Sequence, residues 1–417
     1  MRPLPLALYA AATALAEPLA PWLLRARARK GKEDPARIDE RMGRSAMARP
    51  DGPQVWLHGV SVGESLSLLP LVAGLRARRP ELTILVTCGT VTAATLLGQR
   101  LPPGVIQQFA PVDTPAAAAR FLDHWRPGAA VFVESELWPN LILAARARGV
   151  RLALVSARMT EASARGWARV PATARTLLGA FDLVLPQDAE TAARLAGLGA
   201  RTGPRLNLKL AGPPPPVDAD TVRALKAAIG ERPVVLAAST HPGEERLIAG
   251  AVPEGALLVV APRHPARGAA VAAELAGAGW VTSRRAAGEP LTPATTAYVA
   301  DTLGELGAFF TVAQVVVMGG SFVAGIGGHN PLEPARLGRP VVTGPHVANA
   351  REVYAALFAE AAAIEAADAG ALARHIAGLL AYPHIARRTG EAAAAYARRQ
   401  GAALEAALDL LEPLLRP

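Results

Sequence analysis

Two short acidic motifs contain the residue types needed for acid–base chemistry, and each directly follows an apolar run. In VWLHGVSVGES (55–65), Glu64 comes three residues after Ser61. A carboxylate at this position could act as a general base for a proton within hydrogen-bond reach. The same Ser-x-x-Glu spacing is typical of a capping box at the start of a helix. Local sequence leaves both interpretations open.

The second acidic motif is VFVESELWPNLI (131–142), where Glu134 ends an apolar run and Glu136 follows it closely. Two acids next to Trp138 are unusual for a simple connection, which favours a functional role. The alternative is a helix N-terminus, where the helix dipole stabilises acidic side chains in the first turn.

Two basic loops could complement these acids. SARMTEASARGW (156–167) contains Arg158, and RTGPRLNLKL (201–210) contains Lys209. Such side chains could stabilise anionic groups, or they could simply be solvated, as isolated surface cations usually are. Whether Arg158 and Lys209 are interpreted as functional depends on which residues lie beside them.

The second half of the chain has four further motifs, each after an apolar run: STHPGEE (239–245), APRHPAR (261–267), DTLGELG (301–307) and GGSFVAGIGGHNPLEPARLG (319–338). Arg263 could form a charge-assisted fork to a phosphate. Backbone around Gly304 could approach a base or ribose, and Glu333 could accept from ribose hydroxyls. Amides around Asn330 and Leu332 could meet a phosphate at a helix N-terminus.

The elements that must position these residues follow a βαβα rhythm. Short apolar runs alternate with alanine-rich helical stretches, and the predicted strands are 54–60, 82–87, 129–134, 151–156 and 181–186, then 233–239, 256–263, 280–283, 297–301, 314–320 and 339–344. This alternation predicts doubly wound parallel sheets, whose ligands bind at the carboxyl ends of the strands. From about residue 351 we expect only helix.

Length and a proline-rich segment predict two domains. A chain of 417 residues is long for one core. The proline-rich segment AGPPPPVDAD (211–220) cannot continue a helix or a central strand, so we predict that it is a semi-rigid linker. We therefore expect a membrane-associating helix at 1–24, a Rossmann-like domain at 25–212, a linker at 213–218, a second Rossmann-like domain at 219–390, and a C-terminal helix at 391–417 that packs back on the first domain.

Composition narrows the class of partner. A formal charge of +9 and a pI near 10.3 indicate an anionic partner. Nucleic acid is disfavoured because the basic residues are not interleaved with stacking aromatics. Cys88 is the single cysteine, which excludes an internal disulfide. The chain has no GxGxxG after the first strand, no P-loop, no HExxH and no CxxC, so no metal site is predicted.

The N-terminus is apolar and ends in a cluster of cations: Arg25, Arg27, Arg29, Lys30 and Lys32. Glu17 and four prolines make it a poor spanning helix. A helix lying in the membrane interface, with its basic end toward anionic lipid on the cytoplasmic side, fits better. Two alternatives are a signal peptide cleaved near Ala16 and an amphipathic helix packed on the protein.

Taken in order, HGVSVGES, ESELWPNL, SARMTEAS, NLK, APRHP, DTLGEL, GGSFVAGIGGHNPLEPA and GPH resemble the Kdo (3-deoxy-D-manno-octulosonic acid) transferases of lipopolysaccharide biosynthesis. The resemblance covers nearly the whole chain. It implies a GT-B glycosyltransferase with two Rossmann-like domains facing a cleft. It also implies transfer of Kdo from CMP-Kdo to an anionic, acylated lipid A precursor, with inversion and without a metal or other cofactor, at the cytoplasmic face of the inner membrane.

The resemblance also assigns roles by position. Glu64 resembles the catalytic base, and Glu134 and Lys209 resemble the groups that support the transition state. The CMP site would comprise Pro262, Arg263, Gly304, Glu305, Leu306, Asn330, Pro331, Leu332 and Glu333. One departure from the family pattern is Leu206, which stands before Asn207 where the family usually has glycine. Of the roles assigned by resemblance, the one assigned to Lys209 is therefore the weakest.

Two other functions remain open at this stage. Another GT-B transferase could use a UDP-sugar to build an envelope glycolipid, and competition by CMP rather than UDP would separate the two. A non-catalytic module could instead bind anionic lipid through its basic charge. That module would not depend on Glu64 and would not bind a nucleotide.

Overall fold

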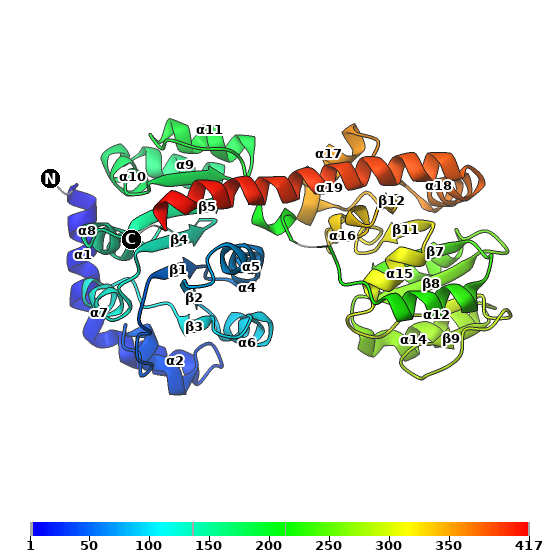
Figure 1. Ribbon diagram of the computed structural model, residues 1–417, viewed down its shortest axis with the longest axis horizontal. Helices are drawn as coiled ribbons and strands as arrows, with labels where there is room; N and C mark the ends of the chain where they lie inside the picture. The colour runs from blue at the N-terminus through cyan, green and yellow to red at the C-terminus, as the bar shows by residue number, and fades with distance from the viewer. Residues whose placement is uncertain (1–2, 136, 213, 416–417) are drawn as a thin grey trace. The chain divides into compact units, whose positions relative to one another are not determined.

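The computed structural model describes residues 3–135, 137–212 and 214–415, so Glu136 lies outside the described residues. Contacts divide the chain into two compact units, Met1–Gly212 with Gln400–Pro417 and Pro213–Arg399 (Figure 1). Each unit is built on one sheet in which every pairing is parallel. The predicted α/β class with two parallel sheets is therefore confirmed.

The sheet of the first unit has the order β3-β2-β1-β4-β5-β6. Its strands are β1 (Gln54–His58), β2 (Thr83–Cys88), β3 (Ile106–Phe109), β4 (Ala129–Val133), β5 (Arg151–Ala157) and β6 (Leu183–Pro186). Because the chain winds outward in one direction from β1 and in the other from β4, these two strands flank the topological switch point. Glu64 lies in the helix that follows β1, and Glu134 directly follows β4.

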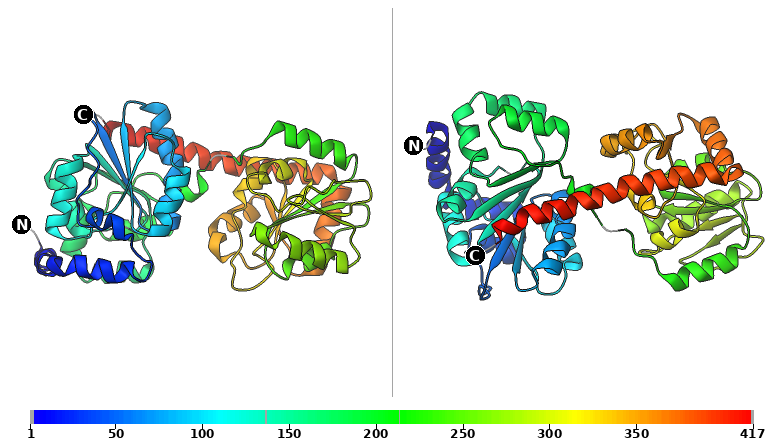
Figure 2. Two further views of the ribbon diagram at one scale, coloured as in Figure 1. Left: turned by 90° about the horizontal axis from the view of Figure 1, so that it is seen from below. Right: turned by 45° about the horizontal axis from the view of Figure 1, so that its top comes forward.

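Helices cover both faces of this sheet (Figure 2). They are α4 (Val62–Ser67), α5 (Leu69–Arg78), α6 (Val91–Arg100), α7 (Pro115–Trp125), α8 (Pro139–Ala147), α9 (Glu161–Ala168), α10 (Pro171–Leu178) and α11 (Ala189–Gly197). Alternate strand residues face opposite cores: Val55 and Leu57 pack in one, Trp56 in the other. Strands buried on both faces are nearly continuous apolar runs, which is why the sequence revealed them.

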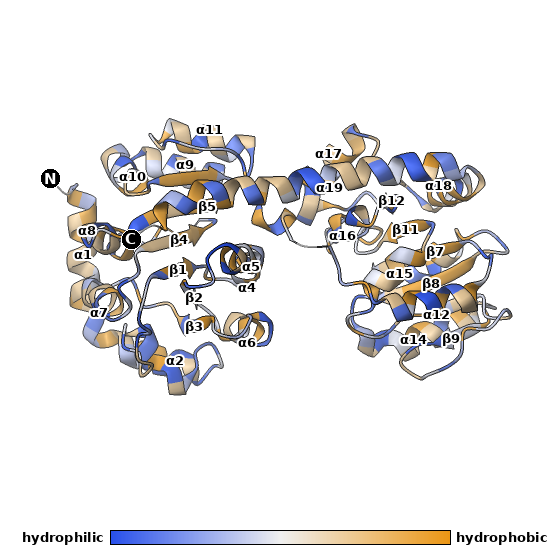
Figure 3. Cartoon of the chain, in the orientation of Figure 1, coloured by the Kyte–Doolittle hydropathy of each residue, from blue (hydrophilic) through white to orange (hydrophobic). Residues whose placement is uncertain are grey.

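The second unit has a seven-stranded sheet in the order β13-β12-β11-β7-β8-β10-β9. Its strands are β7 (Val234–Thr240), β8 (Leu257–Pro262), β9 (Thr282–Arg284), β10 (Ala297–Val299), β11 (Val315–Met318), β12 (Val341–Thr343) and β13 (Ala363–Glu365). The switch point here lies between β7 and β11. In Figure 3 the hydrophobic colouring of β8 marks one of its buried strands.

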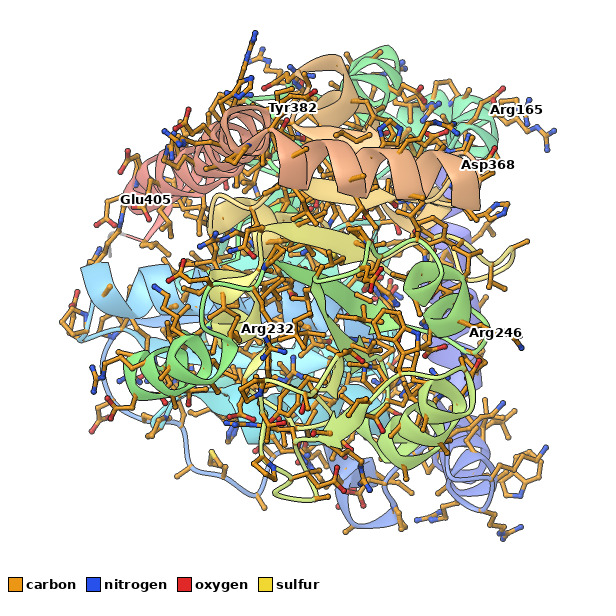
Figure 4. All side chains as sticks on the ribbon, turned by 90° about the vertical axis from the view of Figure 1, so that its right-hand side faces the viewer. Arg165, Arg232, Arg246, Asp368, Tyr382 and Glu405 are labelled. Atoms are coloured by element: carbon orange, nitrogen blue, oxygen red, sulfur yellow. The ribbon has the colours of Figure 1, made fainter. Side chains whose placement is uncertain are left out.

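The helices of the second unit are α12 (Ala219–Ile229), α13 (Glu244–Ala249), α14 (Gly268–Gly277), α15 (Leu306–Val312), α16 (Leu332–Arg336), α17 (Arg351–Ala359), α18 (Ala369–Ala381) and the first part of α19 (Pro383–Leu411). Asp368, labelled in Figure 4, begins α18 by accepting a hydrogen bond of 2.7 Å from the Ala371 amide. The later residues of α19 belong to the first unit, where Leu404, Leu408 and Leu411 join the core.

Two edge strands were not predicted. β3 reads IQQF, whose two glutamines hide any apolar run, and it lies at one edge of the first sheet. β13 reads AIE and lies at an edge of the second sheet, inside the stretch expected to be only helical. That expectation was wrong because pairing with β12 decides the conformation of a three-residue segment whose local composition favours helix.

The N-terminal segment forms α1 (Leu4–Ala16), the short 3-10 helix η1 (Glu17–Leu19) and α2 (Ala20–Ala28). By length and composition, residues 4–28 could cross a membrane. One side of the segment is fastened to the first unit: the Tyr9 hydroxyl donates to Asp113 (3.0 Å), and Arg120 donates to Glu17 (2.7 Å). The other side exposes large apolar residues, namely Leu4, Leu8, Leu15, Leu19, Trp22 and Leu23.

Candidate active site

Glu64 lies in the first turn of α4, and the capping box that its spacing predicted is present. Its Oε2 accepts from the amides of Val60 (2.8 Å) and Ser61 (3.2 Å), while the Ser61 hydroxyl accepts from the Glu64 amide (3.3 Å). Oε1 takes no part in this box. Capping therefore holds one oxygen of the carboxylate in place and does not use the other.

His58, the last residue of β1, supports the loop that leads to Glu64. Nδ1 of His58 lies 2.9 Å from the Thr87 hydroxyl, which also accepts from the Trp56 indole (2.7 Å). Burial lowers the pKa of this imidazole to about 3, so it is neutral at physiological pH.

Glu134 directly follows β4 in a left-handed conformation (φ 56°), which costs a non-glycine residue free energy and is typical of functional sites. Its carboxylate is 5% exposed and pairs with the ammonium of Lys209, which is 46% exposed. Lys209 belongs to the 3-10 helix η3 (Leu208–Leu210), which begins with Asn207 accepting from the Lys209 amide (3.1 Å). Leu206 is buried in the sheet core, so it does not prevent the pairing.

Packing places the Glu134–Lys209 pair close to the first turn of α4. A Cβ built on Gly63 would lie 3.9 Å from Cε of Lys209. A Cβ on Gly59 would lie 3.1 Å from the Glu64 carbonyl carbon and 3.1 Å from Cγ2 of Val133. The structure thus brings together the three residues to which the sequence resemblance assigned catalytic roles.

The Gly59→Ala variant should lose activity because the added methyl group would crowd the Glu64 backbone and Val133. We expect displacement of the first turn of α4, a cost of about 1–3 kcal/mol and at least a tenfold fall in turnover. Gly98→Ala is the matched control: it lies at an exposed position of α6 with no atom within 4 Å of the new Cβ, and alanine favours helix. Thermal melts and initial rates compare the two, and equal activities would contradict the packing argument.

In the second unit, Glu244 organises the loop after β11. Its two oxygens accept from the amides of His241 (2.9 Å), Gly320 (2.7 Å), Ser321 (3.0 Å) and Phe322 (2.9 Å), and the residue is fully buried. The sequence singled out STHPGEE without assigning this role. A carboxylate that accepts several amide hydrogen bonds fixes the loop through charge-assisted contacts.

Pro262 ends β8, and Arg263 follows with an exposed side chain and an amide that donates to the Thr240 carbonyl (3.0 Å). Glu305 precedes Leu306, the first residue of α15, and forms an ion pair with Arg285. That guanidinium lowers the pKa of the Glu305 carboxyl. The sequence gave no sign of Arg285, which lies beyond β9 in chain order.

The NPLE motif begins α16. Pro331 is the residue before the helix, and Leu332 is its first, fully buried residue. The Leu332 amide was expected to meet a phosphate, but here it donates to Oδ1 of Asn330 (3.0 Å). Burial raises the pKa of the Glu333 carboxyl. Gly338 (φ 68°) follows the helix.

The described residues contain no group of three or more His, Cys, Asp or Glu side chains placed to hold a metal ion. Arg246 extends away from the ribbon in Figure 4, and Arg232 donates to carbonyls of the loop at 292–295.

Two doubly wound parallel sheets, each with polar groups at its switch point, form the GT-B fold. A solved glycosyltransferase from Rickettsia africae ESF-5 has this fold, with a TM-score of 0.56 at 10% identity over 88% of this chain and 100% of that chain. The family model of 3-deoxy-D-manno-octulosonic-acid transferase (kdotransferase) matches residues 36–211. Because relatives 38% and 37% identical also cover most of the chain, the chain belongs to the 3-deoxy-D-manno-octulosonic acid transferase family.

Two relatives cover most of the chain. The probable mitochondrial 3-deoxy-D-manno-octulosonic acid transferase of Arabidopsis thaliana is 38% identical over 360 residues, covering 82% of this chain and 79% of that protein. The 3-deoxy-D-manno-octulosonic acid transferase of Bordetella pertussis is 37% identical over 421 residues, covering 94% and 95%. The resemblance found in the motifs is thereby confirmed.

Proposed function

We propose that this glycosyltransferase moves Kdo from CMP-Kdo to a hydroxyl of the acylated disaccharide precursor of lipid A, as a step of lipopolysaccharide synthesis. Family membership supports the donor and the acceptor. The observation that carries the proposal is Glu64 at a switch point, with one oxygen fixed by backbone amides and the other outside the cap. A pre-oriented carboxylate is what a general base requires.

In the proposed step, Oε1 of Glu64 takes the proton from the acceptor hydroxyl. The oxygen of that acceptor hydroxyl forms a bond to the anomeric carbon of Kdo as the bond from this carbon to the phosphate oxygen breaks. CMP leaves with the electron pair. A single in-line displacement inverts the anomeric centre and needs no covalent enzyme intermediate.

The Glu134–Lys209 pair is proposed to adjust the charge around that transition state. Lys209 is half exposed, so it can attract an anionic substrate group while Glu134 holds its ammonium in place. On the donor side, Arg263 is proposed to bind phosphate, and Gly304, Glu305 and Leu306 with Asn330 to Glu333 are proposed to hold the cytidine. Such fixed charges stabilise a leaving phosphate without a divalent ion.

The N-terminal segment is proposed to lie on the cytoplasmic face of the inner membrane. Its exposed apolar side carries Leu15 at 81% and Trp22 at 69% exposure, and the cluster Arg25–Lys32 continues from it. Apolar insertion and attraction to anionic headgroups act together at such a surface. The acceptor is itself an anionic lipid, so the segment would keep the enzyme where its acceptor is.

The experiment is an incubation of the purified chain with CMP-Kdo and the tetraacyl lipid A precursor in the presence of EDTA, followed by mass spectrometry. Addition of one or more Kdo residues is the expected result, and their number becomes known at the same time. Inhibition by CMP but not UDP should accompany it. If product formed only from UDP-sugars, the donor would be a UDP-sugar and not CMP-Kdo. Activity that is lost in EDTA and restored by Mg²⁺ would contradict metal independence.

A further inference from the structure

Three histidines that are far apart in the sequence meet at the switch point of the second sheet. His241 follows β7, His264 follows β8, and His329 lies in the loop between β11 and α16. These strands are neighbours in the order β11-β7-β8, so their carboxyl ends are adjacent. Ligands of doubly wound sheets bind outside the switch point, which here lies between the strands that present His241 and His329.

Two of the rings form a direct pair. Nε2 of His241 lies 2.9 Å from Nε2 of His329, and the rings stack with centroids 5.1 Å apart and planes 13° apart. His264 meets His241 edge to face at 6.1 Å. At this distance the two Nε2 atoms must share one proton, so one ring donates and the other accepts.

The surroundings keep this pair neutral. Burial and the nearby Arg263, His241 and His264 lower the pKa of His329 to about 4. Burial, His264, Arg267 and Arg263 lower the pKa of His241, and only Glu244 opposes them. Glu244 is already committed to four backbone amides, so the pair has no free anionic partner among these neighbours.

The loop that carries His329 is rigidly built around the ring. The Tyr354 hydroxyl donates to the His329 carbonyl (2.9 Å), and the Gly328 amide donates to the Gly320 carbonyl (2.7 Å). A Cβ on Gly320 would lie 2.9 Å from Nε2 of His329, so glycine is required there for space as well as for its φ of 71°. The imidazole is thus pre-positioned beside Arg263 and immediately before Asn330.

We propose that the His241–His329 pair binds the phosphodiester of the nucleotide donor and takes up a proton from solvent when it does so. This inference rests on the donor site proposed above. An anionic phosphate oxygen replaces the bond between the two Nε2 atoms, and both rings then donate to it. The added proton goes to the nitrogen that accepted in the free pair, and the phosphate supplies the negative charge that the site lacks.

Cytidine 5′-(methyl phosphate) is a suitable probe because it is a phosphodiester whose own charge does not change between pH 5.5 and 7.5. Calorimetric titrations in two buffers of different ionisation enthalpy give the protons taken up per ligand. We expect net uptake at pH 6, and a Kd that rises about fourfold from pH 5.5 to 7.5 if the complex raises the pKa of His329 from about 4 by about two units. Cytidine alone should bind without proton uptake.

The variants His241→Gln and His329→Gln keep a hydrogen-bonding amide but cannot be protonated. Each should bind the probe with a Kd that changes less than about twofold over this pH range, and with little proton uptake. His384→Gln, on an exposed part of α19, is the matched control and should behave as the wild type. Thermal melts establish that the variants are folded.

The outcomes separate this inference from the function on which it rests. If the wild-type chain bound the probe without net proton uptake at any pH, the role proposed for the histidine pair would be wrong. The proposed donor site would still be supported. Failure to bind any cytidine phosphodiester, together with no turnover of CMP-Kdo, would overturn both. Unchanged proton uptake in the two glutamine variants would assign the proton to another group and also overturn the proposal.

Discussion

Replacing Glu64 with glutamine should lower turnover by about 10²- to 10⁴-fold, which is the range that general-base catalysis typically contributes. Glutamine has nearly the same shape as glutamate. Its carbonyl oxygen can still accept from the Val60 and Ser61 amides, as Oε2 of Glu64 does now. The cap should therefore survive, while the group that takes the proton is lost. Initial rates with CMP-Kdo and the lipid A precursor measure the effect, and calorimetry with CMP should show unchanged binding.

Ser61→Ala is the control that separates catalysis from capping. It removes the hydroxyl that accepts from the Glu64 amide and leaves the carboxylate unchanged. We expect a loss of stability of about 1 kcal/mol and only a severalfold fall in rate. If Glu64→Gln and Ser61→Ala were equally active, Glu64 would be only a helix cap, and Glu134 would become the candidate base.

The spacing of Ser61 and Glu64 shows what the sequence could settle and what it could not. Capping and catalysis were treated as alternatives, yet the structure places the capping bonds on one oxygen and leaves the other outside them. Spacing reports which groups are near each other along a helix. Spacing does not distinguish the two oxygens of one carboxylate. It therefore cannot show that one oxygen of Glu64 caps the helix while the other is left for catalysis.

The sheets were predictable where burial on both faces produced continuous apolar runs, as in β1 and β7. The edge strands β3 and β13 were not, because pairing with a neighbouring strand determines them. The His241–His329 pair was invisible for a related reason. The two residues are 88 positions apart, and only the strand order β11-β7-β8 brings them together.

The Glu134–Lys209 pair was only partly predictable from the sequence. Neither residue has a local sequence signal that names the other, and they were linked only through family resemblance. In the structure the link depends on two local features: the left-handed conformation of Glu134 at the end of β4, and the short helix η3 that presents Lys209. A conformation of this kind depends on contacts from several segments, so it cannot be inferred from one motif.

Glu244→Gln should be strongly destabilising for the second unit. The two oxygens of Glu244 each accept from two backbone amides. A glutamine amide keeps one oxygen and places an NH2 group against the amides that bonded to the other, so two buried donors lose their acceptor. Each such loss costs about 1–3 kcal/mol, and we expect a total of about 3–5 kcal/mol. For a unit of this size the corresponding fall in Tm is about 10 °C.

The same variant should weaken nucleotide binding, because the amides of Gly320, Ser321 and Phe322 begin the loop that carries His329 and Asn330. Differential scanning calorimetry resolves the melting of the two units, and titration with CMP gives Kd. Glu274→Gln removes the same charge from an exposed position on α14 and should change neither quantity. A Glu244→Gln variant that melts and binds like Glu274→Gln would mean that the loop keeps its shape without this carboxylate, and its order would then have to come from Tyr354 and the glycine turns alone.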